Sequence, residues 1–510
     1  MEKINNREIA AKAKGFFTCI CFLLLLGMIF VSTTFLFRNN RLNRAHIVGI
    51  KQEGPLDMVY VGGSATYGYW QPLKAWNDCG FTSYNYATDN IQAENLKYYI
   101  NEVLKTHTPE LFVVDVRPFQ YWDGIIYENG IRNGVDSFDL SLDRLRFANF
   151  YLSNRTIDET TDVLSYYIGI IKYHSNYDAL RTRKNWGYIW NTGYSNSKGY
   201  ESLTGYQYLD TPTGSLIKAK EKLPVKCENI LIDLLEFCKI RDIKVLFVVS
   251  PYKMTKEDCA KYNTVQNVIE SYGFTYMNTN AYYEEMNIDF ATDFSNEGHV
   301  NVFGAEKYTM FLEKYIEEKY CLPDHRKDVS YEQWNGKYIE FLESESEARK
   351  CVSDLITTVQ EGVNIAEEMT KTLDVAKWWL LANDSRFTLL IAEQGEMSAP
   401  SSRIETKVLQ QWGIDMDRQK EGIIRVINSE TLIYSNAEYE MEISEPVDDS
   451  LKGEYTINTS ENYVSIKFQD KEYCKHNRGL NIVVIDNNYR RVVDSITIYT
   501  DASNQLQLIR

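Results

Sequence analysis

Two side chains suited to acyl chemistry stand far apart in this sequence, and the first is Ser64. It follows Gly62 and Gly63, directly after the apolar run Asp57–Val61, which is typical of a buried strand. The glycines allow a tight turn that no side chain obstructs, and this turn would hold the hydroxyl at the start of the next helix. Backbone N–H groups there, that of Ser64 included, can stabilise an oxyanion. A serine that only caps the helix is the structural alternative.

The second side chain is His299, the candidate base, because a serine hydroxyl is a weak nucleophile until a base takes its proton. His299 lies in the run Asp293–Gly304 (DFSNEGHVNVFG), before the last helix expected in the same domain. Asn296 or Asp293 would orient the imidazole. The remaining histidines stand at no expected strand end and are assigned to the structure or the surface: His46, His107, His174, His325 and His476.

Alternating strands and helices must bring these residues together. Strands are expected at Asp57–Val61, Thr82–Ala87, Leu111–Val116, Lys244–Ser250 and Phe274–Met277, with helices at Glu94–Lys105, Cys227–Lys239, Ala260–Tyr272 and Gly304–Lys319. Uninterrupted apolar strands between helices predict a parallel sheet covered on both faces, hence a three-layer α/β domain over residues 50–325. The active edge of such a sheet lies at the carboxyl ends of its strands, so loops there would carry both Ser64 and His299.

Residues 120–225 interrupt this rhythm and are rich in Tyr, Trp, Asn and Arg, as in the runs Lys184–Tyr188 and Ser195–Tyr200. We interpret them as a partly helical insertion beside the strand ends, where α/β domains bind ligands. An inert excursion is the alternative. Residues 328–380 are polar and helical and are expected to connect to a separate, mostly β domain over residues 384–502, whose short β-type runs begin at Phe387 and end at Tyr499.

The N-terminal region contains one apolar segment, Gly15–Phe37, without a charged residue. As a helix it would be about 34 Å long, enough to cross a hydrocarbon core. A cleaved signal peptide is the alternative, but the segment is long for one and no small-x-small site follows it. The slight excess of positive charge before the segment places residues 1–14 in the cytoplasm. Residues 38–510 would then lie outside a plasma membrane that the chain crosses once.

Composition excludes some classes of function. The net charge of −16 argues against nucleic acid as a partner, because phosphate binding needs a cationic face. The nine cysteines are scattered without a CxxC motif, so neither a disulfide framework nor a zinc site is predicted. We expect no metal and no cofactor. An extracytoplasmic domain without evident disulfides is easier to accept on a bacterial surface than in a eukaryotic secretory pathway.

The strand-end Gly-Gly-Ser, paired with the late Asn-x-x-His-x-Asn-x-x-Gly that begins at Asn296, resembles the SGNH/GDSL hydrolase superfamily. The resemblance covers about residues 55–320. It is nearest to the branch that includes the D-alanyl-lipoteichoic acid and alginate O-acetylation proteins, which also has a downstream proline, here Pro72. It implies a flavodoxin-like α/β fold, a Ser64 nucleophile and a His299 base.

Three departures from the family pattern concern the groups around this pair. The family usually has Asp three residues before the His, where this chain has Asn296. The site would then work as a Ser–His dyad, use Asp293, or be inactive. The family also has a glycine in the second of its motif blocks, and Thr88, Asp89 and Asn90 stand in its place here. They would offer a backbone or side-chain donor to the oxyanion, together with Gly63 and the Ser64 amide.

The third departure is Arg117, which follows the third strand in place of the family's GxND block. It would supply a cationic donor to the oxyanion or to an acidic substrate. The alternative is an arginine paired with Asp115 or Asp123.

Three runs in the C-terminal region, Arg386–Gly395, Gly479–Asp486 and Val492–Ile496, resemble the interleukin-like epithelial–mesenchymal transition inducer (PANDER-like) domain. That resemblance implies a β-sandwich-like module, which in some relatives binds carbohydrate. A spacer without a ligand is the alternative.

The two resemblances together predict a serine esterase or O-acyltransferase, most simply for acetyl groups. Its partners would be a cell-surface glycan or acylated polysaccharide and the membrane, with a membrane acyl-donor protein as a further candidate. The rival hypothesis is a non-catalytic glycan-binding or assembly factor built on a degenerate fold of this type.

Overall fold

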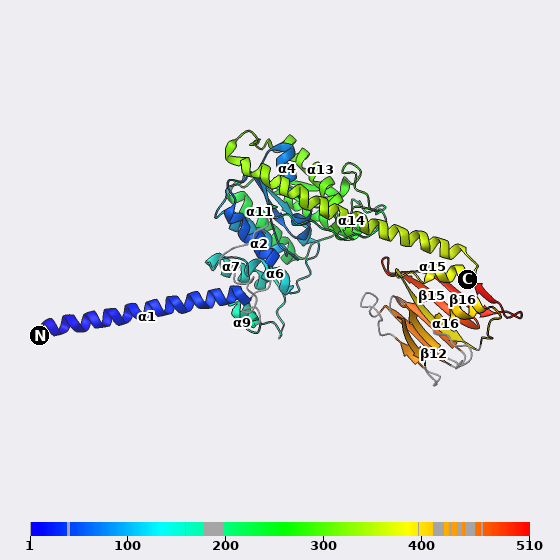
Figure 1. Cartoon of the computed structure of the whole chain (residues 1–510). Coiled ribbons are helices and arrows are strands. Elements are labelled where there is room, and N and C mark those ends of the chain that lie inside the picture. Colours follow the sequence, from blue (N-terminus) through cyan, green and yellow to red (C-terminus); the bar gives the residue numbers. More distant parts are fainter. Residues whose placement is uncertain are drawn as a thin grey trace. The chain divides into compact units, whose positions relative to one another are not determined.

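The computed structural model describes residues 2–37, 41–158, 160–177, 197–395, 397–411, 423–427, 431–435, 441–443, 454–460 and 463–510. The chain forms two compact units, Met1–Val352 and Ser353–Arg510 (Figure 1). The run Lys184–Tyr188 and the first two residues of the run Ser195–Tyr200 lie outside the described residues.

The first unit begins with the single long helix α1 (Glu2–Phe37). Its segment Lys12–Thr34 is long and apolar enough to cross a membrane, judged by length and composition. The last turn differs from that segment, because Leu36 and Phe37 are buried against the rest of the unit. A second helix, α2 (Arg41–Gly49), leads into the α/β core.

The core of the first unit is a five-stranded sheet in the order β2-β1-β3-β4-β5, with every neighbouring pair parallel. Its strands are β1 (Met58–Gly62), β2 (Ser83–Ala87), β3 (Leu111–Asp115), β4 (Val245–Val249) and β5 (Thr275–Asn278), within two residues of the predicted ends. In this order β2 is added on one side of β1, and β3, β4 and β5 follow on the other side. Ligands of such sheets bind outside the carboxyl ends of the strands at this switch point, here between β1 and β3.

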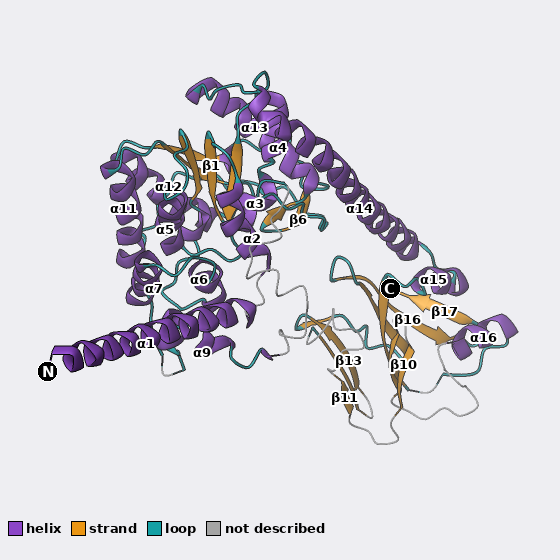
Figure 2. Ribbon diagram, turned by 60° about the vertical axis from the view of Figure 1, so that its left-hand side comes forward, coloured by secondary structure: helices purple, strands orange, loops and turns teal. Residues whose placement is uncertain are grey.

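Helices cover both faces of this sheet, which confirms the predicted α/β class (Figure 2). Side chains alternate along each strand, so Val59 and Val61 pack on one helical layer and Met58 and Tyr60 on the other. The first layer contains α5 (Ala93–Val103), α11 (Val225–Ile240) and α12 (Lys256–Ser271), and the second contains α3 (Ser64–Tyr69), α4 (Pro72–Cys79) and α13 (Val302–Tyr320).

The insertion after β3 is partly helical, as predicted. It contains α6 (Glu128–Val135), α7 (Leu142–Asn154), α8 (Val163–Tyr167) and α9 (Ile170–Tyr173). A buried ion pair attaches it to the core: Arg155 donates to Glu94 of α5 through Nε at 2.7 Å and Nη2 at 2.8 Å. Both side chains are fully buried, so each charge depends on the other for compensation.

The second unit is antiparallel β. One sheet has the order β10-β9-β8-β15-β16-β17 and the other β11-β12-β13-β14. The first sheet comprises β8 (Phe387–Gln394), β9 (Ile423–Ile427), β10 (Thr431–Ser435), β15 (Gly479–Asp486), β16 (Arg491–Thr500) and β17 (Leu506–Ile509). The second comprises β11 (Met441–Ile443), β12 (Tyr455–Ser460), β13 (Tyr463–Phe468) and β14 (Lys471–Glu472).

Each face of the six-stranded sheet has its own core. Leu390 and Val483 pack toward Ile457 and Ile466 of the smaller sheet. The opposite face packs against Trp378 and other apolar residues of α14 (Glu332–Lys371), α15 (Val375–Ala382) and α16 (Arg403–Gln411). The connector predicted over 328–380 is therefore helical, but its second half contributes to this core, so the β unit begins earlier than residue 384.

Replacing Glu94 with Ala should lower the stability of the first unit by about 3–5 kcal/mol, because Arg155 would remain buried without a counter-charge. The loss can be measured by pulse proteolysis of the detergent-solubilised chain, as a fall in the urea concentration at the midpoint of unfolding. The control is Glu340→Ala, which removes a more exposed pair with Lys337 and should cost less than about 1 kcal/mol. Equal midpoints for the two variants would contradict the assigned role of Glu94.

Candidate active site

Ser64 is the first residue of α3 and directly follows the turn after β1. Two glycines in this turn are required by close packing. A Cβ at Gly62 would collide with the Thr66 hydroxyl, and a Cβ at Gly63 would lie 2.7 Å from Ile91 Cγ2. The turn can therefore pass close to two neighbouring segments only without side chains, and this close passage presents Ser64 at the carboxyl edge of the sheet.

His299 belongs to a short hairpin, β6 (Phe294–Asn296) and β7 (His299–Val300), just before α13. Its Nε2 lies 2.7 Å from Ser64 Oγ. This distance is within hydrogen-bond reach and joins the two residues on which the sequence interpretation rests. The hairpin and the serine turn come from opposite ends of the α/β unit and meet at the same edge of the sheet.

Asn296 fixes the tautomer of the histidine. Its Oδ1 lies 3.0 Å from His299 Nδ1 and also accepts the Gly298 N–H at 2.9 Å. Because that oxygen accepts from a backbone N–H, it faces the imidazole as an acceptor and favours a proton on Nδ1. The unprotonated Nε2 then points at the Ser64 hydroxyl, as a general base requires.

Asp293, the alternative orienting residue, is engaged elsewhere. Its Oδ2 accepts from Lys307 Nζ at 2.6 Å and from the Asp289 N–H at 2.7 Å, and its Oδ1 accepts from the Thr292 hydroxyl at 3.0 Å. These contacts fix the start of the hairpin. The structure thus pairs His299 with a neutral amide, and Asp293 acts on the loop rather than on the ring.

The His299 hairpin is also clamped by Tyr69, which lies in the same short helix as Ser64. The Tyr69 hydroxyl donates to the Gly298 carbonyl at 3.0 Å and accepts the Val300 N–H at 3.1 Å, on either side of the histidine. Burial raises the pKa of Tyr69 to about 12, so the hydroxyl keeps the proton that it donates. Serine and histidine are therefore linked by a second, structural connection.

Arg117 reinforces this clamp. Its Nη2 donates to the Gly298 carbonyl at 2.9 Å and to the Tyr121 hydroxyl at 3.3 Å, and the guanidinium lies over the Tyr252 ring. Its backbone N–H donates to Asp115 at 3.0 Å. Of the partners weighed from sequence, Asp123 instead interacts with Arg155 and the Tyr127 hydroxyl.

Burial and the Arg117 charge both disfavour imidazolium, and they lower the pKa of His299 from its ordinary 6.5 to about 4. The negative charge of Asp89 opposes this effect. His299 is thus neutral and able to accept a proton at any pH well above 4. Asp115 ends β3 and accepts from the Ser250 hydroxyl at 2.6 Å. Burial raises the pKa of this carboxyl.

A cavity of about 760 Å³ opens beside Ser64 and His299. Of the loop residues Thr88, Asp89 and Asn90, which were expected to offer a donor to the oxyanion, Asn90 lines it, with a left-handed backbone (φ 51°). The Thr88 hydroxyl is buried 2.6 Å from that of Tyr99, and the Asp89 carboxylate accepts from the Tyr67 hydroxyl. Thr88 and Asp89 therefore support the loop, while Gly63 and Arg117 line the cavity.

Several cavity residues escaped the sequence interpretation. They are Gln92, Tyr121, Ile126, Tyr127, Glu128 and Asn129. Most lie in the insertion, where sequence gave only an aromatic-rich composition and no periodicity. Tyr69 was also missed. Its place in the helix that begins with Ser64 was a usable signal, because a tyrosine buried there needs a hydrogen-bond partner close to the serine. Among the described residues, no three His, Cys, Asp or Glu side chains are placed to hold a metal ion.

Comparison with known proteins does not assign this chain to a family. The sequence matches no protein-family model, and no curated protein matches it either.

The low pKa of His299 gives a signed pH dependence. Neutral imidazole is the active base, so attack by Ser64 should keep its rate as the pH falls from about 7 to about 5 and should decline only near pH 4. The measurement is the rate of Ser64 labelling by a fluorophosphonate as a function of pH. A half-maximal rate near pH 6.5 would mean that burial and Arg117 do not act on His299 in this way.

Asn296→Asp should raise the rate of that labelling at pH 7 by about tenfold or more, because a carboxylate stabilises the imidazolium that forms during attack. It should also move the acid limb of the pH profile upward by about one to three pH units. Glu297→Gln is the control, since it changes the charge of the same hairpin without touching the hydrogen bond to His299. Because Glu297→Gln removes a negative charge where Asn296→Asp adds one, shifts of similar size and opposite sign in the two variants would assign the effect to overall charge.

Proposed function

We propose that this chain is a divergent member of the SGNH/GDSL superfamily, a membrane-anchored serine esterase or O-acyltransferase that acts on cell-surface polysaccharide outside the cytoplasm. The single observation that carries the proposal is the Ser64 Oγ to His299 Nε2 distance of 2.7 Å, with Asn296 on the far side of the ring. The open cavity beside the pair gives an ester room to bind.

In the proposed reaction, Ser64 Oγ attacks the acyl carbonyl while its proton passes to His299 Nε2. The carbonyl oxygen becomes an oxyanion, stabilised by the Ser64 N–H and by the loop at Asn90. The bond to the sugar oxygen then breaks, and His299 returns the proton to that oxygen. Water releases the acyl group from Ser64 in an esterase; a second sugar hydroxyl takes it in a transferase, and His299 again serves as base.

Anchoring supports the proposed location. The segment Lys12–Thr34 would hold the catalytic unit at the membrane, with residues 1–14 in the cytoplasm and the remainder outside. A plasma membrane of a bacterial cell fits this arrangement, because the substrate would then be part of the cell surface. The β unit, which resembles the PANDER-like domain in sequence, is proposed as a carbohydrate-binding partner of the catalytic unit.

The second candidate is a non-catalytic glycan-binding or assembly factor. It is favoured by one observation: the hydrogen-bond partner of His299 Nδ1 is the neutral Asn296, and the charge of Arg117 disfavours an imidazolium that only the charge of Asp89 favours. Such a site would keep the cavity and the hydrogen bonds but turn over slowly or not at all.

A fluorophosphonate probe separates the two candidates in the purified full chain. The enzyme should be labelled at Ser64, and Ser64→Ala should lose labelling and lower hydrolysis of p-nitrophenyl acetate by roughly a thousandfold or more. His299→Ala should lose most of the labelling rate. Ser295→Ala, a partly buried serine in the same hairpin as His299, is the matched control and should behave as the unaltered chain. An unlabelled chain that binds glycan would establish the second candidate.

A further inference from the structure

The helices α7 to α9 and the turns that join them expose an unusual number of large apolar side chains. We call them the apolar surface of the insertion: Leu140, Leu142, Leu145, Ile157, Leu164, Ile168 and Tyr177. Leu142 is 70% exposed and Leu164 55% exposed. Soluble proteins rarely gather such residues on one region of surface unless another phase or molecule covers them.

One end of this region, the helix α9, lies beside the end of α1. Helix α9 packs on α1 in both views (Figures 1 and 2). The Asn176 side chain, three residues after the end of α9, donates to the Phe37 carbonyl at 3.2 Å. The apolar segment of α1 ends at Thr34, three residues before Phe37. The insertion therefore meets α1 where that helix would leave the hydrocarbon and enter the headgroup layer.

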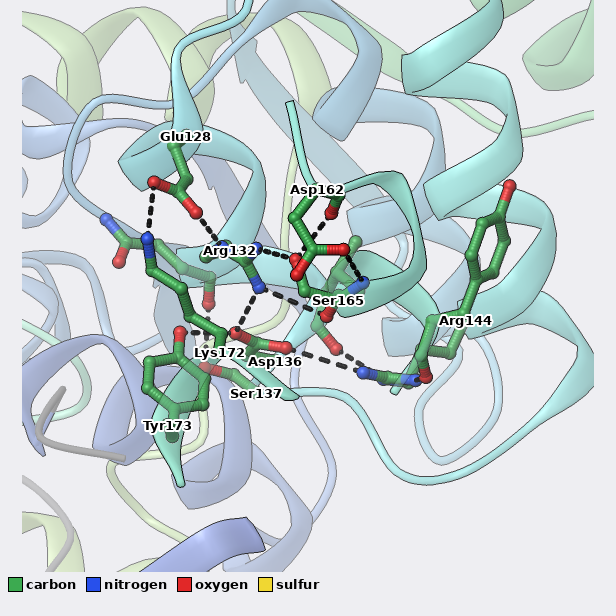
Figure 3. A network of polar contacts seen from close by, with 12 residues as sticks. Glu128, Arg132, Asp136, Ser137, Arg144, Asp162, Ser165, Lys172 and Tyr173 are labelled. Carbon is green, nitrogen blue, oxygen red and sulfur yellow. Dashed lines mark hydrogen bonds and ion pairs between the residues drawn. The ribbon is translucent and has the colours of Figure 1, made fainter. Parts of the chain in front are cut away.

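A network of ion pairs and hydrogen bonds fixes the three helices to one another and to α6 (Figure 3). Arg132 of α6 donates to the Ser165 hydroxyl at 2.6 Å and pairs with Glu128 at 2.7 Å. Asp136 accepts from the Tyr173 hydroxyl at 2.6 Å and pairs with Arg144 at 3.4 Å. Because the buried charges of Arg132, Asp136 and Arg144 compensate one another, the helices of the insertion should move as one body. The contacts of α9 and Asn176 with α1 should make the end of α1 part of that body.

The same body forms one wall of the cavity. Glu128, Asn129 and Gly130, at the start of α6, line the space next to Ser64 and His299. The position of α1 in a membrane would thus be transmitted through α9 and α6 to the cavity wall.

We propose that the apolar surface of the insertion rests in the headgroup layer of the bilayer that α1 spans, and that it holds the Ser64 cavity at the membrane surface for a substrate attached to a lipid. The insertion carries acidic and basic side chains together, among them the exposed ion pair of Glu128 and Lys172, so apolar insertion rather than attraction to anionic lipid would provide the contact. The proposal rests on the anchoring part of the proposed function and not on the chemistry of Ser64.

The test uses the full chain in nanodiscs of phosphatidylcholine, with the photoreactive amino acid p-benzoylphenylalanine replacing Leu142 or Leu164. The matched control carries it at Ile240, which is 83% exposed at the end of α11, just before β4 and so at the amino edge of the sheet. Illumination should give lipid adducts at 142 and 164 at least several-fold above those at 240, unchanged by high salt. Equal yields at all three positions, or adducts that require anionic lipid, would overturn the proposal.

A functional arm uses the double variant Leu142→Ser and Leu164→Ser. It should raise the KM for a short-chain ester attached to a lipid anchor in vesicles several-fold, while the KM for water-soluble p-nitrophenyl acetate stays unchanged. Equal effects on both esters would overturn the role of the surface in substrate delivery. If lipid adducts form but no ester is cleaved and Ser64 resists the fluorophosphonate, the membrane surface stands and the proposed chemistry fails.

Discussion

The hydroxyl of Tyr69 connects two parts of the chain whose meeting makes the candidate active site. It lies in the helix that begins with Ser64 and hydrogen-bonds the backbone on both sides of His299, a residue that follows Ser64 by 235 positions in sequence. A hydrogen bond between two flexible side chains would not by itself keep two segments so distant in sequence together, since the entropy lost in ordering the side chains opposes the contact. The buried tyrosine and Arg117 make the hairpin part of the core, and the contact between Ser64 and His299 follows from that packing.

The electrostatics of the pair differ from those of a serine–histidine–carboxylate site. Asn296 supplies orientation without charge, and Arg117 supplies charge of the unfavourable sign. The chain therefore holds a base that is always ready to accept a proton but gains little from having accepted it. Arg117 is nevertheless needed where it is, because its guanidinium bonds the carbonyl next to the histidine. Structural support and proton affinity are in direct competition at this residue.

Sequence predicted the α/β core closely, because its strands are uninterrupted apolar runs and its helices repeat with clear periodicity. The same signals brought Ser64 and His299 to one edge of a sheet. They did not predict that Thr88 would be buried against Tyr99 or that Asp293 would bond Lys307, since both outcomes depend on contacts between distant segments. The cavity wall in the insertion was also beyond sequence. Its short helices pack apolar residues such as Ile131 and Phe147 into the core, but buried ion pairs such as Arg155 with Glu94 also position them, and sequence does not indicate those partners.

The size of the cavity carries a consequence for selectivity. A space of about 760 Å³ is comparable to the pockets that enclose whole drug-sized ligands, whereas an acetyl group has only a few atoms. In the proposed esterase or O-acyltransferase, most of the lining would then contact the alcohol portion of the ester, through groups such as Gln92, Asn129 and the tyrosines. Discrimination would reside in what bears the acyl group rather than in the acyl group itself. Small synthetic esters would occupy a corner of the cavity, so their turnover would understate the catalytic power available to the natural ester.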